Sequence, residues 1–228
     1  MKIAFLTTIF PMKKQFLIDF FNSLNNQTYD NFDVVVANDG YSNFNEIKLK
    51  YGKLNIVELE CSNTPAKNRE YGINYCIERK YDILIFGDSD DYFSNNRVEL
   101  ALEALNSNDI VVNDVSLFDN NGTYEDMYIS NRLENDSKVN FNYIKNKNIF
   151  GLSNTALKIN ILSKVSFDKD LVAVDWYLYK GLLKNGCKAI FTNKAITYYR
   201  QHKDNTVGLQ ATKGKYYLWW EQRDGEAS

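Results

Sequence analysis

The chain has 228 residues, enough for one large domain with a sizeable hydrophobic core. Its 27 basic and 29 acidic side chains give a net charge of -2, which excludes the basic surface typical of nucleic-acid-binding proteins. No apolar run approaches the ~18 residues that a membrane span needs. The cysteines are odd in number and lack metal-ligand or disulfide spacing, so we expect reduced thiols in a cytoplasmic protein: Cys61, Cys76 and Cys187.

The first half of the chain alternates between apolar runs and helical patterns. Threonines and lysines interrupt residues 1–14 too early for a secretory leader, so this stretch predicts a first strand at 3–6. Further strands are predicted at 32–37, 54–60, 83–86 and 109–114, and helices at 16–24, 65–79 and 97–105. This order is typical of an α/β fold with a mostly parallel sheet, whose ligands bind beyond the carboxyl ends of the strands.

The pattern weakens between residues 119 and 150, which have the polar and aromatic composition of an insertion over the binding edge of the sheet. A strand is then predicted near 152–159, and a helix begins at Asp175 and is closed by Gly186. The last strands are predicted at 188–193 and 195–202. We therefore expect one domain with a short C-terminal tail: 1–205 and 206–228.

The most informative stretch is the acidic cluster that follows the predicted strand 83–86. Asp88, Asp90 and Asp91 are close enough to repel one another and to raise one another's pKa unless a cation or hydrogen-bond donors compensate them. Hard oxygen ligands of this kind suit Mg²⁺ or Mn²⁺, which keep open positions for water and for substrate phosphates. The alternative is ordinary loop chemistry, because aspartate also favours turns and helix caps.

Residues on the donor side of the predicted crevice each have two interpretations. Asp39 follows the strand 32–37 within an Asn-Asp-Gly sequence, which forms either a plain turn or an acceptor for a nucleobase N–H or a ribose hydroxyl. Lys67 and Arg69 lie early in the helix 65–79, where they are either solvated or directed at phosphate oxygens.

Two later residues are equally ambiguous when taken alone. Asp175 stands at a helix start, where a carboxylate commonly serves as a cap that stabilises the helix dipole. His202 is the single histidine of the chain, and it is either a structural side chain or a third metal ligand or phosphate contact.

In their order along residues 1–205, these motifs resemble those of the family 2 glycosyltransferases, which have the GT-A fold. Residues 27–29 are similar to the family's QTY-like segment, and Asp39 to the second acid of its acidic pair. Arg69 and the glycine three residues later resemble the ARN-x-G-I segment. Residues 88–90 match the metal-binding DxD motif, and residues 174–175 resemble the ED motif, whose aspartate is the catalytic base.

The resemblance implies a metal-dependent, inverting transfer of a sugar from a nucleotide-diphospho-sugar, with UDP as the expected nucleotide. It assigns the catalytic base to Asp175. It implies donor contacts from Thr8, Phe10, Asp39, Lys67, Arg69, Asp88, Ser89 and Asp90. It also implies that Mn²⁺ or Mg²⁺ is held by Asp88, Asp90, Asp91 and His202.

The same resemblance suggests how the domain is divided. Residues 1–118 are expected to bind the donor and residues 119–205 the acceptor, a glycan or a lipid-linked sugar, in bacterial surface polysaccharide synthesis. Ser153 and Asn154 are expected to face the donor sugar. The aromatic tail, 206–228, is suited to contact with the inner face of a membrane, with a partner or with a second copy of the chain.

Two other functions remain open at this stage. A sugar nucleotidyltransferase has a related sheet, but it would need a glycine-rich loop after the first strand, and residues 7–15 contain no glycine. A non-catalytic module that binds a nucleotide-sugar or a glycan would keep the fold without turnover. Asn38 and Val174, which stand where the family has acids, favour this second alternative.

Overall fold

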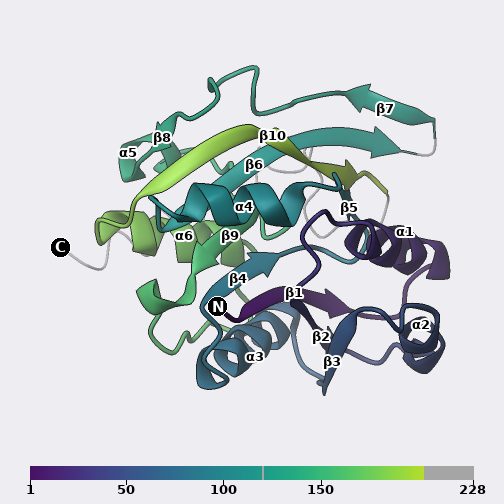
Figure 1. Ribbon diagram of the computed structural model, residues 1–228. Coiled ribbons are helices and arrows are strands. Elements are labelled where there is room, and N and C mark those ends of the chain that lie inside the picture. The colour runs from purple at the N-terminus through teal and green to yellow at the C-terminus, as the bar shows by residue number, and fades with distance from the viewer. Residues whose placement is uncertain (120, 203–228) are drawn as a thin grey trace.

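The computed structural model describes residues 1–119 and 121–202. A mixed sheet forms its centre, with the strand order β3-β2-β1-β4-β9-β6-β10-β5 (Figure 1). The strands on this path are β1 (Ile3–Ile9), β2 (Asp33–Asn38), β3 (Asn55–Glu60), β4 (Ile83–Phe86), β5 (Tyr92–Phe93), β6 (Ile110–Asp119), β9 (Thr155–Lys158) and β10 (Ala189–Arg200). Two short strands lie off this path: β7 (Gly122–Glu125) pairs with β6, and β8 (Lys138–Val139) pairs with β10.

Parallel pairing dominates the sheet, as the alternation of strands and helices predicts. The pairs β1–β2, β2–β3, β1–β4 and β6–β10 are parallel. The exceptions are β9, which is antiparallel to both β4 and β6, and β5, which is antiparallel to β10. The mixed, mostly parallel sheet is thereby confirmed, and the carboxyl ends of β1, β2 and β4 meet at one edge.

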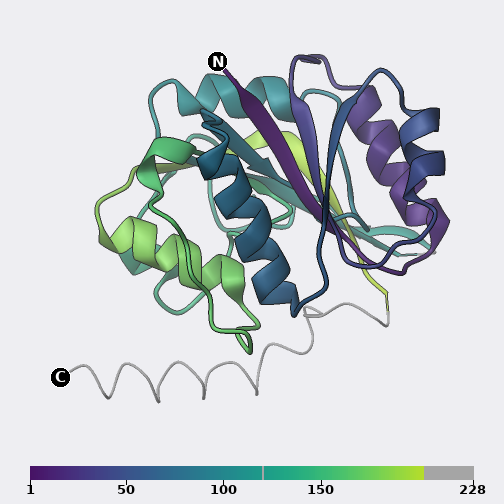
Figure 2. The same ribbon diagram turned by 90° about the horizontal axis from the view of Figure 1, so that it is seen from below.

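Helices cover both faces of the sheet. One hydrophobic core joins the sheet to α1 (Lys14–Asn25), α2 (Phe44–Lys50) and α4 (Arg97–Leu105). The other core joins it to α3 (Pro65–Glu78), α5 (Phe141–Ile144) and α6 (Val174–Lys184), and a short 3-10 helix, η1 (Ile159–Ile161), follows β9. In Figure 2, α3 and α6 lie on the same side of the sheet and α4 on the other. The architecture is a three-layer sandwich of helices, sheet and helices.

The helix boundaries follow local chemistry that the sequence displays. Thr64 caps α3, where its side chain accepts a hydrogen bond from the Lys67 backbone N–H, and Pro65 occupies the first helical position. At the end of α6, Gly186 has a φ of +88°, which a side chain rarely adopts, and its N–H donates to the Leu183 carbonyl. Gly186 thus closes the helix as predicted, one residue beyond the C-cap Asn185.

The observed elements differ from the predicted ones in three places. The two last strands are one strand, β10, whose register shifts between Thr192 and Ile196 while both parts pair with β6. The polar residues at 193–194 therefore mark a bulge and not a turn. Helix α2 was not predicted, since seven residues are too few for a clear helical period. The strand near 152–159 begins only at Thr155.

The stretch from 119 to 150 does not form an insertion over the binding edge alone. Its strand β7 pairs with the end of β6, near that edge, but β8 pairs with the start of β10 at the opposite end of the sheet. Apolar side chains from this stretch enter the core, among them Ile129, Val139 and Ile144. Burial of these side chains explains why the segment follows the sheet.

The structure also describes the cysteines and the length and hydrophobicity of the helices. All three cysteines are unpaired. Among the described residues, no helix is both long enough and apolar enough to cross a bilayer. The predicted tail, 206–228, lies outside the described residues.

Candidate active site

The acidic cluster begins where β4, buried along its whole length, reaches the edge of the sheet. Gly87 permits a close packing there: a Cβ at this position would lie 2.5 Å from a ring carbon of Phe5 and 2.6 Å from one of Phe93. The chain then turns, and the Asp91 N–H donates to the Asp88 carbonyl at 3.1 Å. This turn directs the carboxylates toward the carboxyl ends of the neighbouring strands.

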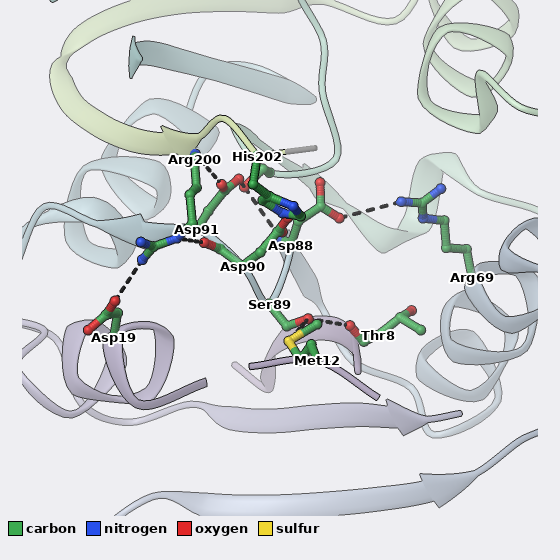
Figure 3. A network of polar contacts seen from close by, with 11 residues as sticks. Thr8, Met12, Asp19, Arg69, Asp88, Ser89, Asp90, Asp91, Arg200 and His202 are labelled. Atoms are coloured by element: carbon green, nitrogen blue, oxygen red, sulfur yellow. Dashed lines mark hydrogen bonds and ion pairs between the residues drawn. The ribbon is translucent and has the colours of Figure 1, made fainter. Parts of the chain in front are cut away.

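Hydrogen bonds from distant elements fix the side chains of this turn (Figure 3). Asp91 is buried, and it accepts from the Ser153 hydroxyl and, at 2.8 Å, from the Arg200 backbone N–H. The Asp90 carboxylate lies 2.9 Å from His202 Nε2, and the Asp90 carbonyl accepts from Arg200 Nε at 2.8 Å. The end of β10 therefore lies against the turn after β4.

The remaining two residues of the turn face β1 and α3. Ser89 is buried and donates to the Thr8 carbonyl at 2.7 Å, which gives it a structural role beneath the cluster. Asp88 Oδ1 lies 3.5 Å from the guanidinium of Arg69, and Thr8 lines the same small cavity as these two side chains. Of the two basic candidates in α3, Arg69 is the one that reaches the acidic cluster.

Electrostatics show that the carboxylates share one crevice. The pKa of Asp88 is raised to about 6. Burial is the largest cause, Arg69 opposes it, and the charges of Asp90 and Asp175 add to the increase. Burial also raises the pKa of Asp91, with contributions from Asp90 and Asp88. Tyr199 has a raised pKa for the same reasons, burial first and then all four carboxylates. Residues far apart in the sequence are thus brought together at the sheet edge.

Asp175 lies in the first turn of α6 but is not its N-cap, which is Ala173 without a side-chain cap bond. Its Oδ1 accepts from the Trp176 N–H at 2.7 Å. Burial raises the pKa of Asp175, while the Trp176 N–H, Arg69 and the Asn148 side chain oppose this increase. A half-buried carboxylate with a raised pKa is better suited to accept a proton than an exposed one.

Asp39 lies just beyond β2 and is hydrogen-bonded to Asn68, whose Nδ2 donates to it at 2.8 Å. Asn68 is buried in α3, and within the described part of the chain its Oδ1 has no partner. Lys67 is directed elsewhere, to Glu70 at 2.7 Å. Phe10 is 44% exposed, beyond the end of β1. The structure therefore places Asn68, and not Lys67, beside Asp39.

Asn38, Asn154 and Ser153 are all held in hydrogen bonds within the protein. Asn38, which replaces an acid of the family motif, donates to Glu58 at 2.7 Å and accepts from the Tyr41 N–H at 2.8 Å. Asn154 is buried and donates to the carbonyls of Asn113 and Ile149, so it organises its own loop. Ser153 is buried too, between Asp91 and the Asp88 N–H.

Sequence reasoning missed Arg200 and Tyr199, which lie in the crevice. They are the last two residues of β10 and precede the single histidine by a few positions. A basic residue close to a lone histidine was the available signal. The contact of Arg200 with the Asp90–Asp91 turn depends, however, on the pairing of β10 with β6, which the sequence does not specify.

The predicted metal ligands do not converge on one point. In residues 1–119 and 121–202, no three side chains among histidine, cysteine, aspartate and glutamate are grouped so as to hold a metal ion. Asp91 has both oxygens occupied by hydrogen bonds. Asp88 and Asp90 nevertheless fit a divalent cation chemically, because they are hard oxygen donors whose mutual repulsion a cation would relieve.

Comparison with known proteins gives a consistent result. The sequence model of glycosyl transferase family 2 matches residues 9–171, whereas no curated protein matches the chain. Residues 1–349 of S. aureus TarS, solved with UDP-GlcNAc, have a TM-score of 0.72 at 17% identity, over 97% of this chain and 64% of that chain. GalNAc-T7, solved with UDP, GalNAc and Mn²⁺, has a TM-score of 0.60 at 11% identity, over 89% and 44%.

The chain thus spans less than two thirds of the TarS and GalNAc-T7 chains with which it was compared. At these identities the likeness concerns the fold. It confirms the predicted α/β class, a mostly parallel mixed sheet flanked by helices as in GT-A glycosyltransferases.

Proposed function

The chain belongs to glycosyl transferase family 2, and from this premise we propose that it transfers a sugar from UDP to a hydroxyl group of a glycan or lipid-linked acceptor, with inversion. The observation that carries the proposal is the meeting of Asp175 with Asp88 and Asp90 in one crevice, where their charges raise the pKa of Asp88. Transfer requires the diphosphate of the donor and the hydroxyl of the acceptor to be bound next to each other, and this crevice offers carboxylates for both.

In this proposal, Asp88 and Asp90 would hold the divalent cation, Mn²⁺ or Mg²⁺. His202, which lies 2.9 Å from Asp90 and is not grouped with both carboxylates in the described structure, would become a further ligand when the ion is bound. The bound ion would stabilise the negative charge on the diphosphate leaving group. Asp91, whose oxygens accept from Ser153 and Arg200, would position the turn instead of binding the ion. Arg69, 3.5 Å from Asp88, would add a positive charge on the phosphate side.

Asp175 is the proposed catalytic base. It would accept the proton of the acceptor hydroxyl as that oxygen bonds to the anomeric carbon from the side opposite the diphosphate. Its raised pKa and its place at the start of α6, across the crevice from Arg69, support this role. One displacement at the anomeric carbon inverts the configuration.

Asp39 is the proposed nucleobase contact, and Asn68 is the residue that positions it. Asp39 can accept from a base N–H, while the buried Asn68 holds the Asp39 carboxylate through its Nδ2. The complexes of TarS with UDP-GlcNAc and of GalNAc-T7 with UDP favour UDP among the nucleotides that have such an N–H. Residues 1–118 would supply the donor site and residues 119–205 most of the acceptor site, in bacterial surface polysaccharide synthesis near the inner face of the membrane.

A thermal-denaturation and hydrolysis screen tests the proposal. The protein is heated with UDP-, GDP- or dTDP-sugars in the presence of Mn²⁺, Mg²⁺ or a chelator. A UDP-sugar with metal is expected to stabilise the protein by about 2.7 kcal/mol at ~100 times Kd, and slow release of UDP is expected to follow. Asp90→Asn should lose the metal dependence, and the exposed Asp30→Asn should keep it.

The non-catalytic module is the second candidate, favoured by the predicted metal ligands, which within the described part of the chain do not form a group of three. It predicts stabilisation by a nucleotide-sugar without metal dependence and without release of UDP. Failure of every nucleotide-sugar to stabilise the protein would contradict the transferase and leave a glycan-binding module as the candidate.

A further inference from the structure

A second cavity, of about 550 Å³, lies between α1, β5 and the end of β6. Its polar lining comes mainly from six residues, which define what we name the α1 groove: Asp19, Asn22, Asn26, Tyr92, Asn95 and Arg200. A volume of this size is within the range of pockets that bind small molecules. The nucleotide-sugar proposal makes no use of this groove.

Arg200 forms the wall between the α1 groove and the acidic crevice. Its backbone N–H and its Nε bind Asp91 and the Asp90 carbonyl, while its terminal nitrogen lies 2.6 Å from Asp19 in the groove. Figure 3 shows Asp19 and Arg69 on opposite sides of the acidic turn. The groove is therefore separate from the cavity of Asp88 and Arg69, with which it shares no lining residue.

The charges of the groove favour a neutral ligand. Asp19 and Arg200 neutralise each other, and the guanidinium is also held between the rings of Phe16 and Phe118, at 4.4 and 4.5 Å from their centres. Among the described residues that line the groove, no other side chain is charged. A phosphate or carboxylate ligand would have to take Arg200 from Asp19, so a neutral ligand is favoured.

The hydrogen-bonding groups of the groove suit a polyhydroxylated ligand. Asn26 and Asn95 are exposed, and within the described part of the chain neither side chain makes a hydrogen bond. An amide both donates and accepts, which matches neighbouring hydroxyl groups on a sugar ring. Tyr92, half-buried and stacked on Tyr198 at 4.5 Å, adds a hydroxyl and a rigid ring.

From these observations we propose that the α1 groove binds a neutral carbohydrate, one or two sugar units in size, at a site distinct from the donor site. The combination of unused amides, a tyrosine and no net charge carries this assignment. It does not depend on catalysis in the acidic crevice. If transfer occurs there, the groove would hold a glycan by a sugar remote from the reacting hydroxyl.

Ligand-detected NMR tests the assignment on the whole protein. The probes are the methyl glycosides of glucose, galactose and N-acetylglucosamine, with cellobiose, lactose and chitobiose, each with and without excess UDP and Mn²⁺. At least one probe is expected to bind, to remain bound in the presence of UDP, and to lose about tenfold or more in affinity in the double variant Asn26→Ala/Asn95→Ala.

The matched control is Asn45→Ala, an exposed asparagine on α2 away from the groove, which should bind as the unaltered protein does. Equal melting temperatures verify that the variants fold. Absence of binding by all six probes, competition by UDP, or full binding by the double variant would each overturn the assignment. If UDP itself does not bind, the donor proposal fails, while the variants still locate the sugar.

Discussion

Asp88 is a residue whose ionisation opposes folding. Its pKa of about 6 is above the ordinary 3.8, so between these two values the folded protein binds more protons than the unfolded chain. Stability contributed by the protonated form is present below pH 3.8 and is lost as the pH rises through 6. Asp91, with a pKa raised in the same direction, adds to the effect.

Asp88→Asn is therefore expected to raise the melting temperature at pH 7 in the presence of a chelator. The amide carries no charge to be repelled by Asp90 or Asp175. Between pH 4 and pH 7, the melting temperature of the variant should fall less steeply than that of the unaltered protein. Asp30→Asn, at an exposed site, should follow the unaltered curve; a variant that is less stable at pH 7 would contradict the account.

Asp175→Asn is expected to reduce transfer by a factor of about 10² to 10⁴, the usual contribution of a general base. The amide has nearly the same shape and can still accept from the Trp176 N–H through its carbonyl oxygen. Nucleotide affinity should therefore change little. Turnover with UDP-sugar and acceptor, together with UDP titration, measures both; retained turnover would remove Asp175 from the mechanism.

Among the elements, α1 and α4 are joined by one buried side chain. Gln27 donates to the carbonyls of Ser23 and Ser94 at 2.9 Å and accepts from the Val98 N–H at 2.9 Å. The Val98 N–H belongs to the first turn of α4, which has no side-chain cap bond at Asn96. The glutamine of the QTY-like segment thus has a structural role: it joins the end of α1 to the start of α4.

Gln27→Leu is expected to destabilise the protein by about 2 to 4 kcal/mol, because it leaves the Ser23 carbonyl and the Val98 N–H without partners. The Ser94 carbonyl loses one of its two donors and keeps the Arg97 N–H. Urea denaturation measures the change. Gln15→Leu, at an exposed position on α1, is the matched control and should change stability by less than about 0.5 kcal/mol. An equal effect of both variants would show that Gln27 is not the link between the helices.

At the scale of the whole molecule, a chain of polar contacts connects the two helical layers through the sheet. Arg97 begins α4 and is fully buried, with its terminal nitrogen 3.1 Å from the Thr155 carbonyl in β9. The Thr155 hydroxyl lies 2.5 Å from the Tyr179 hydroxyl in α6. Burial lowers the pKa of Arg97 to about 9, so the charged guanidinium reduces stability at neutral pH.

Arg97→Met is therefore expected to be neutral or to stabilise the protein by ~1 to 4 kcal/mol at pH 7, since a residue of similar volume replaces a poorly compensated charge. Chemical denaturation at pH 7 measures the change. If the variant lost more than ~1 kcal/mol of stability, the hydrogen bond from Arg97 to the Thr155 carbonyl would outweigh the cost of burying the guanidinium charge.

Local patterns determined much of the architecture. The apolar period placed α1, α3, α4 and α6, and the cap at Thr64 marked the start of α3, because these signals lie within a few residues of one another. The same patterns wrongly divided β10 into two strands, because the polar residues at 193–194 interrupt its apolar run although both parts pair with β6. They also gave no signal for α2, which is too short to show a helical period.

The sequence by itself determined the family, the strand that ends at the acidic turn and the presence of Asp175 at a helix start. Only the tertiary structure decided that Arg69 faces Asp88 while Lys67 binds Glu70, and that Arg200 reaches the turn after β4. It also assigned Asp91 and Asn154 to buried hydrogen bonds. The reason is physical: residue type fixes what a side chain can bind, whereas long-range strand pairing fixes which partners come within reach.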